Sequence, residues 1–239
     1  MSTTRSTRAD IAQQILDHAS RLFARHGFDA VSLAQISKLV GIRKPSLLYH
    51  FRNKDTLRQA VLEELLAHWN DVLPKLLMAA TSGTEQFDAV LSKTVGFFAE
   101  DRDRARLILR ELLDRPEQVQ PLIETHVRPW VTIVCNYIRR GQDQGRLWFE
   151  VQPEHYVAHV TLMVIGSLAT FDSLAALVPD QDDQQALLDR HIRELLRIAK
   201  TSLFRPRPSA SAGIPATPAS NEAPPPADAQ TPELASNHS

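Results

Sequence analysis

The first regular pattern of apolar positions along the chain has the spacing of an α-helix. Between about residues 8 and 26, apolar side chains recur every three or four positions, which places them on one helical face. These side chains are Ile11, Ile15, Leu16, Ala19, Leu22 and Phe23. Gly27 can adopt the left-handed conformation that ends a helix, and Phe28 can then fold back onto Phe23. The sequence therefore predicts a helix over about 8–26.

Residues 32–51, SLAQISKLVGIRKPSLLYHF, predict two short helices joined by a tight turn. Ser32 and Gln35 have the spacing of a capping box, and Gly41 suits a left-handed helix end. Pro45 is tolerated in the first turn of the second helix because that amide has no intrahelical acceptor. Such a pair is typical of a helix-turn-helix, whose second helix can enter the DNA major groove.

The helical period predicts which side chains of this pair face inward and which face outward. The inward set is Ala34, Leu39, Ile42, Leu47 and Phe51, and the outward set is Arg43, Lys44, Ser46, Tyr49 and His50. A solvated face on a small helical corner explains the outward set as well as a DNA contact does. The pattern by itself leaves both interpretations open.

Helical patterns continue to about residue 204. A long helix capped by Asn53 is predicted to extend to about Met78, with Pro74 ending or kinking it. Further helices are predicted at about 85–100, 103–114, 117–142, 153–177 and 182–204, and Pro121 and Pro129 are expected to interrupt the one at 117–142. Because alternating runs of Val, Ile and Thr are few, strands have little support. The predicted fold is all-α, with an N-terminal helix-turn-helix, a helical body and about nine helices in all.

The predicted helix at 153–177 is apolar almost all round after Val157, so it must be covered on every side. Gly166, Ser167 and Ala169 allow another helix to approach closely. One chain can cover one face, and a second subunit can cover the other. We therefore expect a homodimer through the helices at about 153–177 and 182–204.

The net charge of −1 conceals an asymmetry between the two parts of the chain. Up to Lys54 there are nine basic and three acidic residues, a balance of +6, so the other 185 residues must carry −7. A basic module on an acidic body is the electrostatic pattern of a nucleic-acid binder with a second domain of different function. This asymmetry favours DNA contact over a merely solvated face.

The composition and the two ends of the sequence narrow the class of protein further. The single cysteine, Cys135, excludes an internal disulfide, and its apolar neighbours favour a buried structural role over redox sensing. The start MSTTRSTRAD lacks the apolar stretch of a signal peptide, and the longest apolar run is too short to span a bilayer. A cytoplasmic protein is therefore expected. Eight of the 15 prolines lie in residues 206–239, which predicts a disordered tail.

The segment from Ile11 to about Val61 resembles the N-terminal domain of the TetR family of bacterial transcriptional regulators. The resemblance lies in LFARHGFDAVSLAQISKLVGIRKPSLLYHFRNKDTLRQAV and covers about a fifth of the chain closely. It implies a dimeric repressor that a small-molecule effector releases from its operator. The expected division is a flexible basic arm at 1–9, a DNA-binding domain at 10–54, a ligand-binding and dimerisation domain at 55–205, and the tail at 206–239.

Carried over residue by residue, the family pattern implies a recognition helix with Lys44, Ser46, Tyr49 and His50, and phosphate contacts at Ser32 and Lys54. Arg43 departs from the pattern, since the family usually has a small capping residue there. The expected DNA-binding set is Arg5, Arg8, Ser32, Arg43, Lys44, Pro45, Ser46, Tyr49, His50 and Lys54. The two arginines of the arm can follow phosphates or the minor groove, although a disordered start is an equally good interpretation.

In the body, a set of aromatic and polar side chains is expected to line an effector cavity. The set is Phe97, Phe98, His126, Trp130, Tyr137, His159 and Met163. A metal site at His155 and His159 is the weaker alternative to an ordinary helix face because no third ligand is evident. No cofactor is predicted, and no nucleophile elbow, P-loop or dinucleotide motif supports an enzyme. The alternative function is a helical adaptor that binds a protein partner without specific DNA binding.

Overall fold

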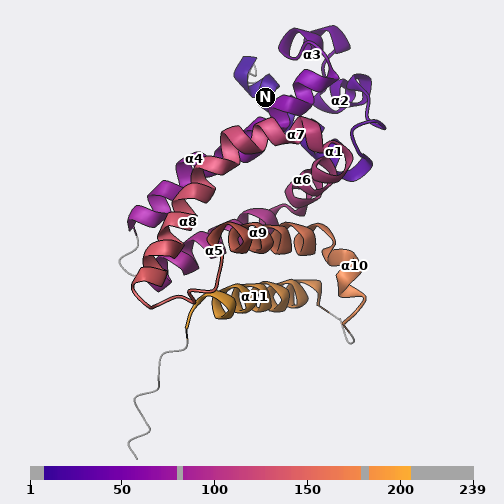
Figure 1. The fold of residues 1–239 in the computed structure, drawn as a ribbon. Helices are drawn as coiled ribbons and strands as arrows, with labels where there is room; N and C mark the ends of the chain where they lie inside the picture. The colour runs from indigo at the N-terminus through magenta and orange to yellow at the C-terminus, as the bar shows by residue number, and fades with distance from the viewer. Residues whose placement is uncertain (1–7, 80–82, 179–182, 206–239) are drawn as a thin grey trace, which may run out of the picture. The chain divides into compact units, whose positions relative to one another are not determined.

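The computed structural model describes residues 8–79, 83–178 and 183–205, and helices account for most of them (Figure 1). The helices are α1 (Arg8–His26), α2 (Leu33–Val40), α3 (Lys44–His50), α4 (Lys54–Ala79), α5 (Gly83–Glu100), α6 (Arg102–Asp114), α7 (Pro116–Leu122), the π-helix η1 (Ile123–Val127), α8 (Arg128–Asp143), α9 (Pro153–Ala169), α10 (Phe171–Ala175) and α11 (Gln184–Leu203). The described ranges contain no strand, only an isolated bridge between Leu147 and Phe204. The all-α prediction is confirmed.

Two of the predicted helices are divided, which raises the number of helices above nine. The stretch at 117–142 contains α7, η1 and α8, and the stretch at 153–177 is divided into α9 and α10. At the end of η1 the amide of Arg128 donates to the carbonyl of Ile123, five residues earlier. In a regular helix the ring of Pro129 would clash with the carbonyl four residues before it. The wider π turn accommodates that proline.

Local capping sets the ends of the first helices as predicted. α1 ends because Gly27 adopts a φ of 81°, and the ring centroid of Phe28 then lies 5.4 Å from that of Phe23. The capping box of Ser32 and Gln35 is present at the start of α2. α1 begins at Arg8, so the last two residues of the predicted arm at 1–9 are helical.

α2 presents a different face to the core from the one predicted. The prediction turns Ala34 and Leu39 inward, but both are exposed, Leu39 to 54%. Ile36 and Ser37 are buried instead, and the Ser37 hydroxyl donates to the carbonyl of Leu33 at 2.7 Å. The helical period gives the spacing of an apolar stripe, whereas the position of α1, against which α2 packs, selects the buried face.

One apolar core extends from the first helices into the body. It contains Phe23 of α1, Leu57 of α4, Leu107 of α6, Val164 of α9 and Leu195 of α11, all at most 3% exposed. α6 packs against both α1 and α9, so it lies between the helix-turn-helix and the body. None of the helices in residues 8–79, 83–178 and 183–205 combines the length and apolarity that a membrane span requires.

Candidate nucleic-acid interface and internal cavities

The outer face of α3 is exposed and carries side chains suited to DNA. Arg43 precedes the helix and makes no side-chain capping hydrogen bond, while Lys44 and Ser46 are exposed in its first turn. Tyr49 is 67% exposed, and its ring centroid lies 5.7 Å from that of the half-buried His50. Cations, a hydroxyl and an aromatic ring on one short helix can contact both phosphates and base edges.

The start of α1 reaches the same surface. Cζ of Arg8 lies 4.6 Å from the centroid of the Tyr49 ring, a cation–π distance. The structure thus brings this arginine of the expected DNA-binding set to the recognition helix. Pro45 lies in the first turn of α3. Arg5 lies outside the described residues, and its role stays a prediction.

Ser32 and Lys54 have partners within the chain. The Ser32 hydroxyl accepts from the amide of Gln35 at 3.2 Å. The Lys54 ammonium donates to the carbonyl of Asp29 at 3.3 Å and lies 4.2 Å from the centroid of the Phe28 ring. An ammonium has three donors, so this bond leaves Lys54 able to contact a phosphate.

Two apolar cavities lie in the body, and they share the side chains of Val90, Thr94, Trp130 and Thr161. The first is lined mainly by α5, α8 and α9 and ends at Leu203 of α11. The second, of about 140 Å³, is lined by α4, α5, α6, α7, η1, α8 and α9. The lining of both cavities is mainly apolar, which suits a small apolar molecule.

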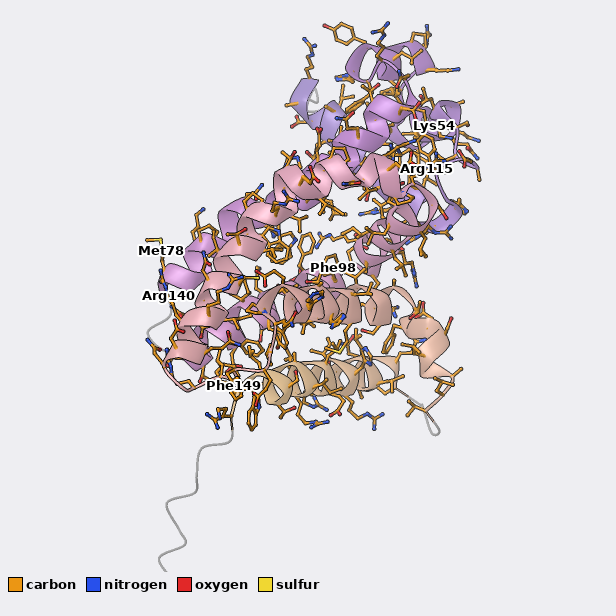
Figure 2. All side chains as sticks on the ribbon, viewed as in Figure 1. Lys54, Met78, Phe98, Arg115, Arg140 and Phe149 are labelled. Carbon is orange, nitrogen blue, oxygen red and sulfur yellow. The ribbon has the colours of Figure 1, made fainter. Side chains whose placement is uncertain are left out.

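The expected effector set is only partly gathered at these cavities. Trp130 and Tyr137 line the first cavity, and Phe98, which points into the interior in Figure 2, lines the second together with Trp130. The other four, Phe97, His126, His159 and Met163, line neither cavity. Phe97 is buried against Trp69 and Phe98, and His159 is exposed on α9. The helical period predicts which side chains share one face of a helix, but, as for α2, it does not determine which face lines a cavity.

Sequence reasoning missed five polar side chains of the cavity walls, namely Gln86, Thr94, Tyr156, Thr161 and Glu111. Thr94 lies four residues after Val90 in the apolar stripe of α5, and its hydroxyl donates to the Val90 carbonyl at 2.8 Å. A threonine within such a stripe is a signal that could have identified this wall.

Glu111 connects the second cavity to the helix that follows the helix-turn-helix. It is buried on α6, and its carboxylate accepts from Nη1 of Arg58 on α4 at 2.5 Å. Arg58 is buried as well, and its Nη2 donates to Gln118 of α7. A cavity wall and the start of α4 are therefore joined by one buried ion pair.

A second connection runs from the end of α6 to the loop between α1 and α2. The Arg115 guanidinium donates to both carboxylate oxygens of Asp29 at 2.7 Å and lies 4.6 Å from the centroid of the Phe28 ring. Figure 2 shows Arg115 beside Lys54, which contacts the same ring. The Phe28 ring is thus surrounded by cations from both parts of the molecule.

The alternative metal site gains no support from the geometry. The ring centroids of His155 and His159 are 6.4 Å apart, and the neighbouring Glu154 carboxylate accepts from Arg139. In the described part of the chain, no group of three or more His, Cys, Asp or Glu side chains is arranged to hold a metal ion.

The helix pair of α2 and α3, with its exposed cationic second helix, defines a helix-turn-helix protein of the DNA-binding class. Residues 15–61 match the family model of the bacterial regulatory proteins of the tetR family. The negative transcriptional regulator IcaR of the biofilm operon icaADBC from Staphylococcus epidermidis is 27% identical over 115 residues, 48% of this chain and 60% of the relative. IcaR from Staphylococcus aureus strain Newman is 27% identical over 134 residues, 56% and 70% respectively.

Solved structures share the fold over most of the chain. A transcriptional regulator from Saccharomonospora viridis in complex with choline has a TM-score of 0.65 at 17% identity, covering 83% of this chain and 100% of that chain. A TetR family regulator from Agrobacterium tumefaciens has a TM-score of 0.61 at 24% identity, covering 80% and 98%. The family model thus places residues 15–61 in the tetR family, and the solved structures share the fold of the chain.

Proposed function

We propose that the chain acts in the cytoplasm as a homodimeric repressor and leaves its operator when a small molecule binds the cavities of the body. The observation that carries the proposal is Glu111, which lines the second cavity and is ion-paired to Arg58 at the start of α4. A molecule that enlarges this cavity moves one end of that ion pair. The other end belongs to the helix that directly follows α3 in the chain.

Repression is supported by the IcaR relatives, which are named negative transcriptional regulators, although the match covers only 60% of the Staphylococcus epidermidis protein. The proposed contact is the outer face of α3 with Arg8 beside it. Two recognition helices of a dimer would lie about 34 Å apart, one turn of DNA. An effector that alters this spacing lowers DNA affinity by its differential binding to the two states.

Dimerisation is supported by apolar side chains left exposed on α9 and α11. Leu162 of α9 is 54% exposed and Ile198 of α11 is 41% exposed. α9 and α11 pack against each other and lie far from α3 (Figure 1). A second copy that covers this surface keeps both recognition helices free for DNA.

The proposal is tested by binding of the purified full chain to DNA fragments that flank its own gene, with Lys44→Ala and Tyr49→Ala as variants. Both variants should lose specific binding, because Lys44 and Tyr49 supply exposed charge and aromatic contact on α3. Loss of one phosphate contact should also reduce the dependence of log K on log salt by about one unit. Sedimentation should show an unchanged dimer for each variant.

Lys93→Ala is the matched control, since Lys93 is an exposed lysine on α5, outside the helix-turn-helix. It should bind DNA as the unmodified chain does. Full, sequence-specific binding by both α3 variants would refute the assignment of the interface. A chain that binds no fragment specifically at any salt concentration would instead be the adaptor.

A further inference from the structure

The two apolar cavities adjoin each other, because four side chains line both of them. Val90 and Thr94 of α5, Trp130 of α8 and Thr161 of α9 belong to both walls. A ligand that occupies both cavities therefore has two apolar ends and a middle that passes these four side chains. The polar groups near this middle decide which ligand chemistry is accepted.

Trp130, whose side chain lines both cavities, has an unsatisfied hydrogen-bond donor. Its Nε1 is buried and has no hydrogen-bond partner among the residues that the structure describes. An indole N–H can only donate, and a buried donor without a partner is unfavourable, so an acceptor on a ligand would satisfy it. By contrast, the hydroxyls of Tyr137 and Tyr156 in the same cavity already donate to the carbonyls of Gly83 and Ala199.

The walls provide no counter-charge for an ionised ligand. In the described ranges, Glu111 is the sole charged side chain that lines either cavity, and Arg58 already pairs with it. Burial raises the pKa of both Tyr137 and Tyr156, so these phenols stay neutral at physiological pH. An anion would enter an apolar space without a cation to meet it, which is strongly unfavourable.

We propose that the effector is an uncharged, elongated, mainly apolar molecule with one acceptor between two apolar ends, such as a ketone or ester carbonyl, and that Trp130 Nε1 donates to this acceptor. The inference rests on the proposed function, because it names the chemistry of the molecule that releases the operator. Trp130 is then the residue that selects for the acceptor, while the apolar walls of the two cavities hold the ends.

The test measures direct binding of 6-undecanone, a ketone with its carbonyl in mid-chain, to the full chain without DNA by calorimetry. Undecanoate, with the same number of carbons, is the charged comparison. The ketone should bind, and the carboxylate should bind more than about tenfold more weakly because its charge is buried without a partner. Trp130→Phe keeps an aromatic ring but removes the donor, and should weaken ketone binding about fivefold.

Trp148→Phe is the matched control, since Trp148 lines neither cavity and lies against Arg205. It should bind the ketone as the unmodified chain does, and both variants should keep their helical circular dichroism. The proposal is overturned if 6-undecanone does not bind, if undecanoate binds equally well, or if Trp130→Phe binds the ketone with unchanged affinity.

A separate operator-release assay distinguishes failure of this inference from failure of the proposed function. If 6-undecanone binds through Trp130 but leaves the operator occupied, the proposed ligand chemistry is confirmed and the proposed release of the operator by an effector is refuted. If an ionised molecule releases the operator while the ketone does not bind, the proposed release by an effector is confirmed and the proposed ligand chemistry is refuted.

Discussion

Arg58 and Glu111 are two charged residues in the buried interior, where an unpaired charge is energetically unfavourable. Their side chains are 7% and 5% exposed. Desolvation makes such a pair a weak source of net stability, yet removal of one partner leaves the other charge buried and unpaired. The pair therefore constrains α4 and α6 to one relative arrangement more than it stabilises the fold.

A buried pair of this kind predicts the outcome of a double-mutant cycle. Arg58→Met should lower the free energy of unfolding by about 3–5 kcal/mol, because Glu111 is left without its partner. Addition of Glu111→Leu should recover most of that loss. Urea unfolding of the single and double variants measures both steps. A loss below about 1 kcal/mol for Arg58→Met alone would mean that water reaches Glu111 and the pair is not truly buried.

Cys135 carries a second prediction at the level of the residue. It is 1% exposed and packs with Ile138, Val157 and Leu203, and burial raises the pKa of its thiol above the ordinary 9.0. The thiolate is the reactive form, so the folded protein should react with a disulfide reagent at pH 8 more than about 100-fold more slowly than the urea-unfolded chain. Equal rates would indicate a reactive, accessible thiol and reopen a redox role.

At the level of the element, helix ends could be predicted where their chemistry is local. Gly27, Gly41 and the capping box of Ser32 act within a few residues, so α1 and α2 begin and end where the sequence indicates. Pro129 predicts the interruption near η1, but the buried face of α2 depends on α1, and the π turn at η1 depends on how the proline is accommodated. Neither can be read from local spacing alone, and the walls of the cavities depend in the same way on helices distant in sequence.

Arg43 stands at the start of α3, where a capping side chain would stabilise the helix. It occupies the N-cap of α3 with φ −81° and ψ 148°, which suits a capping side chain, but it makes no capping bond. Arg43→Ser should raise the free energy of unfolding by about 1 kcal/mol by capping α3. Arg43→Ala removes the same charge without adding a cap and should give no such gain. Thermal unfolding of the two variants separates capping from charge, and equal stabilities would exclude the capping explanation.

At the level of the whole molecule, the head formed by α1–α3 is not held to the body by charge alone. Buried Asp103 of α6 accepts from Arg25 of α1 at 2.7 Å and from Arg106 at 3.0 Å, and Arg106 donates to Asp172 of α10 at 2.6 Å. The same path is followed by the apolar core, which is continuous from α1 through α6 to α9. The sequence predicted a DNA-binding domain at 10–54 from the change in charge near Lys54 and the resemblance, whereas shared burial is visible only in three dimensions.

Because the core is continuous, we predict that α1–α3 and the helices of the body unfold together. Phe23→Ala in α1 should cost about 3–5 kcal/mol. It should lower hydrogen-exchange protection of core amides in α9 as much as in α1, because a shared cooperative unit loses protection throughout. Phe149→Ala, at a side chain that is 73% exposed, is the control and should change neither. If protection falls in α1 while α9 keeps its own, the head is an independent unit, and an effector signal would reach DNA through α4 and the ion pairs of Arg25, Arg58 and Arg115.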